Sequence, residues 1–292
     1  MNASLRRVWV EDSVIESWLR EDISLTDITT YALRIGGEGV AEVVTRDPIM
    51  VACSEEAGRI YEIAGARVKV LKHSGEDAAA GQTVLVARGD ATSLHKAWRL
   101  AQVLVAICSG VATKTLRMVT AARRANPNVC VAVTRKAPPG LRRLYVKAAM
   151  AGGAVPHRAG LSDSILVFDN HIAFIPGGWR EFLTIIPRLR REYPFRKIGV
   201  EVRSLRQAIE AVKAGAEMIQ LEKMSPEDIS RAVKELRSIK EDVVIAAAGG
   251  IDEHNIGEYA AAGPDIIVTT APYKAPPADI TTRMGRAWRS RV

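Results

Sequence analysis

The chain has 292 residues, of which 48% are hydrophobic and 25% are charged, a balance typical of a folded globular protein. Its formal net charge of +8 fits an anionic partner, although composition alone favours a generally basic surface. Nucleic acid is a poor candidate for that partner, because only 5% of the residues are aromatic and they do not alternate with Lys/Arg tracts. Three cysteines without ligand-like spacing argue against a zinc site and agree with a reducing cytoplasm.

The sequence also predicts no membrane segment. The N-terminal stretch MNASLRRVWVEDS lacks the long apolar core of a signal peptide. The longest apolar run, around residues 103–108, is far shorter than the roughly 20 residues of a membrane span. We therefore expect a cytoplasmic protein without a membrane partner.

The first part of the chain predicts a small α/β domain. Residues 12–22 place apolar side chains on one helical face. Residues 39–46 and 66–89 alternate apolar and polar residues between Gly and Asp turns, a pattern typical of antiparallel strands. Residues 93–125 have the composition of a long helix or of two helices, with a break expected at Ser109-Gly110.

From residue 128 onward the chain alternates short apolar strands with helical segments, which predicts parallel βαβ units. The lengths of these segments favour an open or incomplete barrel with fewer than eight strands. The helical segments are residues 204–215, 225–238 and 252–263. The expected strands lie within residues 128–136, 164–171, 197–204, 217–223, 243–250 and 265–272.

Basic residues follow the first strands of this predicted barrel, at the carboxyl ends where the chemistry of such barrels collects. Arg135 follows the first strand, and His157-Arg158 precede the second. Each arginine can hold a carboxylate or a phosphate through two parallel hydrogen bonds, and Lys136 adds a point charge. The sequence therefore predicts an anion-binding rim.

Acidic residues and glycines follow the later strands. Glu201 and Glu222 would repel a bound anion unless a cation lies between them and the ligand, and Mg²⁺ bridged by a diphosphate suits such oxygen ligands. Gly249-Gly250 stand between a strand and a helix, where backbone N–H groups can approach a phosphate closely.

Each of these residues also has an ordinary structural interpretation. A single Arg or Lys at a strand end is most often a solvated charge, and a Gly-Gly pair before a helix is most often a plain turn. Glu201 could pair with Arg135, and His171 could cap or pack. Their convergence on one predicted rim is what favours a binding site.

Four segments of the second half are TRKAPPGLR, GGAVPHRAGLSDSILVFDNHI, GVEVRSLRQAIEAVKAGAEMIQLEKMSPE and AAAGGI. They resemble the quinolinate phosphoribosyltransferase family (nicotinate-nucleotide pyrophosphorylase, carboxylating). EDISLTDITTYAL and RLAQVLVAICSGVAT match in the same order, so the resemblance covers nearly the whole chain.

The resemblance implies an N-terminal α/β sandwich domain over residues 1–112, joined by returning residues 275–292, and an open, TIM-barrel-like α/β barrel over residues 113–274. It implies transfer of phosphoribosyl from PRPP to the ring nitrogen of quinolinate, with Mg²⁺. The products would be nicotinate mononucleotide, diphosphate and CO2, a step of NAD biosynthesis. It also implies a homodimer or a higher oligomer in which Arg99 reaches the neighbouring active site.

Carried over position by position, the resemblance implies a role for each matching residue. Lys136, Glu201 and Glu222 would be catalytic, with the two glutamates also near Mg²⁺. The substrate-binding residues would be Arg99, Arg135, His157, Arg158, Ser162, His171 and Lys223, and the phosphate-binding residues would be Gly249, Gly250, Thr270 and Ala271.

The chain departs from the quinolinate enzymes at several positions. Phe168 stands where they usually have a lysine, Pro156 replaces an asparagine, and Ala246 and Ala248 replace a Glu and a Ser. AVPHR, LEKMSP and VTTAPYKAPPADI are closer to the ModD-type branch, which is associated with molybdenum-transport genes. The alternatives are therefore a ModD-type enzyme with another acceptor or a molybdate-linked anion-binding protein. A Schiff-base lyase that uses Lys223 or Lys136 is the third alternative.

Overall fold

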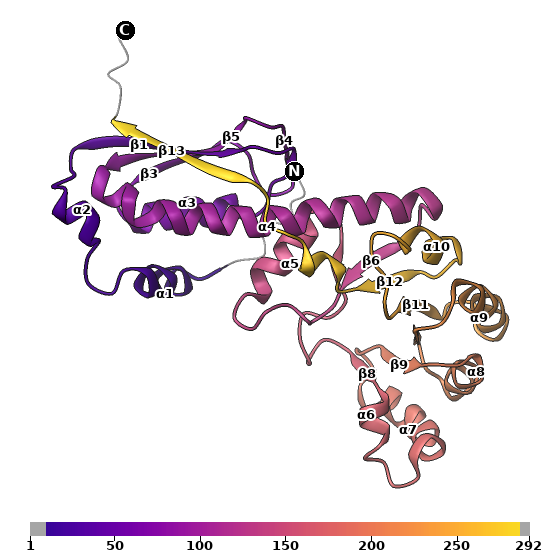
Figure 1. Cartoon of the computed structure of the whole chain (residues 1–292). Helices are drawn as coiled ribbons and strands as arrows, with labels where there is room; N and C mark the ends of the chain where they lie inside the picture. Colours follow the sequence, from indigo (N-terminus) through magenta and orange to yellow (C-terminus); the bar gives the residue numbers. More distant parts are fainter. Residues whose placement is uncertain (1–9, 287–292) are drawn as a thin grey trace. The chain divides into compact units, whose positions relative to one another are not determined.

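The computed structural model describes residues 10–286, which divide into two compact units (Figure 1). The N- and C-terminal parts of the chain meet in the first unit, and the second unit is built mainly from one continuous stretch. The division falls inside the longest helix. Unit 1 comprises residues 10–116, 138–153 and 273–286, and unit 2 comprises residues 117–137 and 154–272.

Unit 1 is built on an antiparallel sheet whose strand order is β13-β1-β5-β3. The C-terminal strand β13 pairs with β1 over seven residues, from Thr45↔Ile280 to Gly39↔Arg286. Alternation along β1 buries Ala41 and Val43 in the core of this unit. The strands are β1 (Glu38–Thr45), β3 (Arg67–Val70), β5 (Thr83–Asp90) and β13 (Ile280–Arg286), with β2 (Ile49–Met50) and β4 (Asp77–Ala78) in a separate ladder.

Helices complete unit 1, and the helix expected over residues 12–22 is confirmed as α1. Its residue Ile15 is buried, as the apolar periodicity of this segment predicts. The helices are α1 (Asp12–Asp22), α2 (Ile28–Ala32), α3 (Ser54–Ile63), α4 (Ala91–Ala125) and α5 (Arg142–Ala151).

Of the two alternatives for residues 93–125, the single long helix is confirmed, because α4 continues through the candidate break at Ser109-Gly110. A side chain at Gly110 would overlap the carbonyl oxygen of Pro276, so the glycine serves close packing rather than a bend. Ser109 Oγ accepts a hydrogen bond from the Ala52 backbone N–H at 3.1 Å. Both residues therefore fasten neighbouring segments of unit 1 to an unbroken helix.

Helix α4 is the one helix of the described residues that is long and apolar enough to cross a membrane, by length and composition only. Its apolar window is longer than the run at residues 103–108 that the sequence analysis singled out. Half of that window is buried inside the protein, and Ala101, Val105 and Cys108 are core residues of unit 1.

Unit 2 contains a curled seven-stranded sheet with the order β7-β6-β12-β11-β10-β9-β8, in which every pair is parallel. The consecutive strands β7 and β8 form its free edges, so the barrel is open between them. The expected α/β fold and the six expected strands are confirmed. The strands are β6 (Cys130–Val133), β7 (Val155–Pro156), β8 (Ile165–Val167), β9 (Ile198–Val202), β10 (Met218–Glu222), β11 (Val244–Ala248) and β12 (Ile266–Thr269).

Helices cover the outer side of this sheet (Figure 1). Ser204 and Ser225 cap α8 and α9 by accepting backbone N–H groups of the first turn, which explains why these expected helices begin there. Helix α7, which contains Pro187, was not among the expected helices. The helices are α6 (Asp169–Ile172), α7 (Gly178–Glu192), α8 (Leu205–Ala214), α9 (Pro226–Ile239) and α10 (Ile256–Ala261), followed after β12 by the 3₁₀ turn η2 (Ala271–Lys274).

Candidate active site

Three basic residues lie at one corner of the open barrel: Arg135 after β6, and His157 and Arg158 after β7. We call them the cationic rim. All three are half-buried. Arg135 Nε and His157 Nε2 are buried without a hydrogen-bond partner among the described residues. Burial first, and then the neighbouring Arg135, lower the pKa of Arg158, against the opposite effect of Asp163. The rim therefore concentrates positive charge that the described residues leave largely unpaired.

His157 contributes to this rim as a neutral group. Burial lowers the pKa of its imidazole, and the charge of Arg158 lowers it further. Because the ordinary pKa of histidine is already about 6.5, the ring is uncharged at neutral pH. His157 is thus suited to hydrogen bonding, while the two arginines supply the charge.

The loop of residues 157–164 spans the opening between β7 and β8. Arg158 Nη1 donates to the Ser164 carbonyl at 3.3 Å. Asp163 Oδ2 accepts the backbone N–H groups of Ala159 at 2.5 Å and Gly160 at 3.4 Å. Arg196 Nη1 donates to the Asp163 carbonyl at 2.9 Å. These contacts hold the loop that carries Arg158 in a defined shape.

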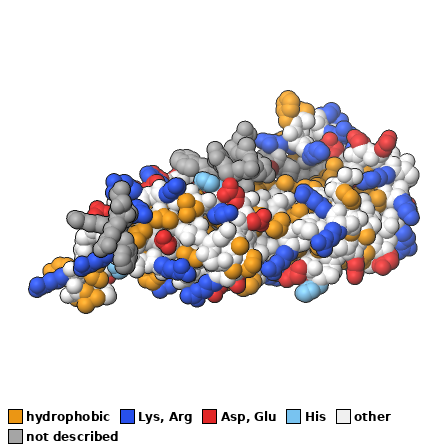
Figure 2. All heavy atoms as spheres, turned by 90° about the horizontal axis from the view of Figure 1, so that it is seen from above, with side chains coloured by type: hydrophobic (Ala, Val, Ile, Leu, Met, Phe, Trp, Pro, Cys, Tyr) orange, Lys and Arg blue, Asp and Glu red, His pale blue; other side chains and the backbone are white. Residues whose placement is uncertain are grey.

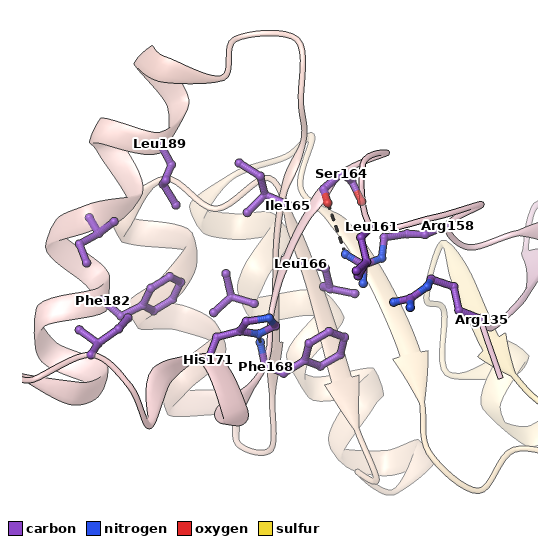
Figure 3. Close-up of a pocket in the computed structure, with 13 residues that line it drawn as sticks. Arg135, Arg158, Leu161, Ser164, Ile165, Leu166, Phe168, His171, Phe182 and Leu189 are labelled. Carbon is purple, nitrogen blue, oxygen red and sulfur yellow. Dashed lines mark hydrogen bonds between the residues drawn. The ribbon is translucent and has the colours of Figure 1, made fainter.

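A pocket of about 590 Å³ lies beside the edge strand β8, and we call it the β8 pocket. Figure 3 shows Arg135 and Arg158 at one side of it and Phe182 and Leu189, from α7, at the other. A volume of this size is typical of small-molecule sites. The lining residues are Arg135, Arg158, Leu161, Ser164, Ile165, Leu166, Val167, Phe168, His171, Ile175, Phe182, Ile185 and Leu189.

His171 lines the β8 pocket and also caps the short helix α6. Its Nδ1 accepts the backbone N–H of Phe168 at 3.0 Å, which leaves Nε2 as the nitrogen free to donate when the ring is neutral. The rings of Phe168 and His171 are stacked with centroids 5.6 Å apart, and the Arg158 guanidinium carbon lies 5.9 Å from the Phe168 ring centroid. Capping and pocket lining are therefore combined in one side chain.

Two carboxylates, which we call the acidic pair, lie on the neighbouring strands. Glu201 on β9 is paired in register with Gln220 on β10, and Glu222 follows two residues later on the same face. Gln220 Nε2 donates to Glu201 Oε2 at 2.5 Å. Burial raises the pKa of Glu201 and the charge of Glu222 raises it further, against the Gln220 hydrogen bond. Because the two carboxylates repel each other, a cation bound between them would be stabilised.

The turn after β11 lies against the acidic pair. Gly249 and Gly250 have φ values of +92° and +76°, which favour glycine. A Cβ atom on Gly249 would lie 2.8 Å from the Lys223 backbone nitrogen and 2.9 Å from Glu222 Oε1, whereas one on Gly250 would meet nothing within 4 Å. Gly249 is thus required for close packing, and Gly250 presents open backbone to an approaching ligand.

The last predicted phosphate-binding residues follow β12. Thr270 Oγ1 lies 2.9 Å from Thr134 Oγ1, which joins the ends of β12 and β6. The Ala271 backbone N–H donates to Thr269 Oγ1 at 3.0 Å, so that amide is already used within the turn. Of this pair, the Thr270 hydroxyl is the group better placed to meet a ligand.

Four predicted site residues are exposed. Lys136 directly follows Arg135, Ser162 lies in the loop after Arg158, and Lys223 follows Glu222 beside the glycine turn. Ser162 does not line the β8 pocket, and Lys223 has a φ of +57° in the turn after β10. Arg99 is exposed on the part of α4 that belongs to unit 1, with its guanidinium carbon 4.0 Å from the Trp98 ring centroid.

The sequence analysis missed Gln220 and the apolar residues that α7 contributes to the pocket. Phe182, Ile185 and Leu189 recur at helical spacing, which was the available signal in a stretch that also contains Pro187. The departures Ala246 and Ala248 are buried and pack with Ala132 and Val268 in the barrel interior.

An open parallel α/β barrel with a cationic rim, an acidic pair and a glycine turn at its strand ends defines the chain as an enzyme that acts on anionic substrates. Comparisons with known proteins identify the family. Residues 27–109 match the quinolinate phosphoribosyl transferase N-terminal domain, and residues 111–283 match the C-terminal domain. The chain therefore belongs to the quinolinate phosphoribosyltransferase family, whose members are phosphoribosyltransferases.

Individual relatives agree with this assignment. The pyrophosphorylase ModD of Rhodobacter capsulatus is 42% identical over 247 residues, which cover 84% of this chain and 94% of the relative. A carboxylating nicotinate-nucleotide pyrophosphorylase of Methanothermobacter thermautotrophicus is 35% identical, with 87% and 91% covered. The solved structure of NadC from Streptococcus pyogenes superimposes with a TM-score of 0.85 at 27% identity, covering 94% of this chain and 96% of that one.

Proposed function

We propose that this protein transfers the phosphoribosyl group of PRPP to the ring nitrogen of a pyridine carboxylic acid, with quinolinate as the reference acceptor. With quinolinate the products are nicotinate mononucleotide, diphosphate and CO2, as in NAD biosynthesis. Family membership supports the transfer reaction, and the relatives' names divide between ModD and nicotinate-nucleotide pyrophosphorylase.

One observation carries the proposal: residues on or just after four strands of a single sheet supply opposite kinds of charge at the same strand ends, and a glycine turn follows a fifth strand. The cationic rim follows β6 and β7, the acidic pair lies on β9 and β10, and the glycine turn follows β11. Arg135 and Arg158 would hold the acid, while Gly250 and Thr270 would receive the 5′-phosphate.

The chemistry requires this separation of charges. The bond between C1 of the ribose and the diphosphate oxygen breaks, both electrons leave with diphosphate, and the ring nitrogen lone pair forms the new bond to C1. With quinolinate, a proton then replaces the carboxyl group lost as CO2. Because C1 becomes positively charged in the transition state, Glu201 and Glu222 would stabilise it, while the cationic rim holds the acceptor in line.

Mg²⁺ would accompany PRPP at the acidic pair. The described residues contain no group of three or more His, Cys, Asp or Glu side chains able to hold a metal ion. Two adjacent carboxylates suit Mg²⁺ that takes its other ligands from a diphosphate and from water. Bound there, Mg²⁺ would neutralise the charge of the leaving diphosphate. Glu201 and Glu222 would hold the ion against the substrate.

The remaining parts of the proposal concern assembly and location. We propose a homodimer or higher oligomer in which the exposed Arg99 of one subunit joins the acid-binding residues of another, and an activity in the cytoplasm. Arg99 is exposed, with its guanidinium carbon 4.0 Å from the Trp98 ring centroid, so its charge is presented to solvent. The face seen in Figure 2 shows Lys and Arg side chains interspersed with acidic ones, without a continuous basic surface.

The test is a diphosphate-release assay with PRPP, MgCl2 and a panel of quinolinate, nicotinate, isonicotinate and picolinate. We expect release that requires both PRPP and one of the acids and that stops when EDTA removes the metal. Quinolinate would release CO2 in equal amount. No release with any acid contradicts the proposal.

Two outcomes would indicate the alternatives instead. Calorimetric binding of molybdate without any PRPP binding would indicate an anion-binding protein. Covalent trapping by borohydride with a keto acid would indicate a Schiff-base lyase, because phosphoribosyl transfer forms no adduct with the protein. Neither Lys136 nor Lys223 is buried, so the desolvation that activates such lysines is absent at both residues.

A further inference from the structure

The β8 pocket has a charged side and an apolar side (Figure 3). Of the described residues that line it, Arg135 and Arg158 carry a permanent positive charge. Opposite them stand the α7 side chains Phe182 and Leu189, and Phe182 is almost fully buried. The pocket therefore suits a ligand that carries its negative charge at one end and an apolar part at the other.

The charged side suits a single anionic group. Burial lowers the pKa of Arg158, and the nearby Arg135 lowers it further, which shows that the two guanidinium groups lie within electrostatic reach of each other. Arg135 Nε is buried without a hydrogen-bond partner among the described residues. One carboxylate placed between the two guanidinium groups would relieve their repulsion and use both sets of donors.

Phe168 leaves no comparable position for a second anionic group. Its ring stacks on His171 and lies 5.9 Å from the Arg158 guanidinium carbon, so it forms the wall next to the charged side. The face of an aromatic ring carries partial negative charge and repels a carboxylate. A second carboxylate against this wall would lose its hydration and would meet no further cationic side chain among the residues that line the pocket, where His171 Nε2 is the nearest donor to Phe168.

We propose that the pocket selects an aromatic monocarboxylate, with the acid between Arg135 and Arg158 and an apolar ring edge against Phe168. This inference rests on the phosphoribosyltransferase function proposed above and narrows its acceptor. The ribose C1–oxygen bond breaks with both electrons going to diphosphate, and the ring nitrogen lone pair forms the bond to C1. The product nucleotide keeps its carboxylate, so no CO2 is released.

Nicotinate and quinolinate form the matched pair of probes, since they share one ring and differ by one carboxylate. We expect kcat/KM for diphosphate release to be at least about tenfold higher with nicotinate. Phe168→Lys adds a cation at the wall and should raise kcat/KM for quinolinate about 10- to 100-fold, the range expected of a hydrogen bond to a charged group.

Two further variants separate charge from shape. Phe174→Lys adds the same charge at a residue that is 90% exposed and does not line the pocket. This substitution should leave kcat/KM unchanged for both nicotinate and quinolinate. Phe168→Leu removes the ring without adding charge and should keep the preference for nicotinate. Circular dichroism of each variant checks that it is folded.

The outcomes distinguish this inference from the function on which it rests. Equal or better use of quinolinate by the natural protein, or an unchanged preference in Phe168→Lys, overturns the inference while phosphoribosyl transfer stands. Absence of diphosphate release with every acid overturns the transfer function and the inference with it.

Discussion

Two clusters of charge in this protein are built in opposite ways. In unit 1, Lys147 is buried with a side-chain exposure of 4%, and its Nζ donates to Glu56 at 2.7 Å and to Glu55 at 3.1 Å. In unit 2, Arg135 and Arg158 lie near each other, and no carboxylate forms an ion pair with either within the described residues. The first cluster is compensated within the protein, and the second is not.

The pKa shifts follow the same division. Burial lowers the pKa of Lys147, but Glu56, Cys53 and Glu55 together raise it above its ordinary value. Burial also acts on Glu55, yet Lys147 and Ser74 lower the pKa of that carboxyl to about 2. At Arg158, burial and then Arg135 lower the pKa of the guanidinium and outweigh the opposite effect of Asp163. Charge that is paired within the fold is costly to unpair, whereas charge left unpaired at a pocket is available to a ligand.

The largest expected effect comes from breaking the compensated cluster. Lys147→Met would leave Glu56, whose side chain is 8% exposed, as an uncompensated buried charge. We expect a loss of about 3–5 kcal/mol in the free energy of unfolding, measured by urea denaturation at pH 7. Arg20→Met removes an exposed partner of Glu16 and should change the free energy of unfolding by less than about 1 kcal/mol. Equal effects of the two substitutions would show that burial does not distinguish these ion pairs.

A substitution in the uncompensated cluster should change stability less than Lys147→Met does, and it should act mainly on the use of the acid acceptor. Arg158→Gln removes a guanidinium that lies near Arg135, so the free energy of unfolding should stay within about 1 kcal/mol of the natural value. The kcat/KM for the acid acceptor should fall about 10- to 100-fold, because a hydrogen bond between charged groups is lost, while calorimetry shows unchanged PRPP affinity.

Arg188→Gln is the control for that substitution. Arg188 lies on α7, where it pairs with Glu192 at 3.6 Å, and it is 60% exposed outside the pocket lining. This substitution removes the same charge and should leave both acceptor use and stability unchanged. A large loss of stability in Arg158→Gln, with normal acceptor use, would reverse the contrast between the two clusters.

Local sequence patterns predicted those strands and helix caps that depend only on residues close together in the chain. Strands β9 to β12 are apolar runs, and the polar residues at their carboxyl ends lie together because parallel strands end at one edge. The caps of α8 and α9 were readable from Ser204 and Ser225. The acidic pair and the glycine turn followed from the same reasoning.

Other features depend on contacts between distant residues, which no local pattern contains. Lys147 and Glu56 are 91 positions apart, and neither lies in a recognisable motif. Gly110 was a candidate helix break, but its packing against Pro276 explains the residue instead. Strand β7 has only two residues, one of them Pro156, and its edge position in the sheet is what tolerates proline. The neutral state of His157 likewise depends on burial that the sequence does not show.

The smallest expected effect concerns His157, which lies at the cationic rim beside Arg158 and near Arg135. Burial and then Arg158 lower its pKa in the folded state, so the unfolded state binds the proton more readily. Stability therefore falls as the pH drops below the unfolded pKa of about 6.5 toward the lower folded value, and it is fully regained above 6.5. Urea denaturation at pH 7.5 and 5.5 should show the natural protein losing stability relative to His157→Gln.

Proton NMR of the His157 ring measures the same quantity directly and separates its two causes. In the natural protein the imidazole should titrate below 6.5. In Arg158→Gln the nearby positive charge is gone while burial remains, so the pKa should rise only part of the way. A His157 pKa above 6.5 in the natural protein would mean that a carboxylate outweighs the arginines at this corner. The rim would then be compensated like the cluster around Lys147, and the contrast between the two regions would no longer hold.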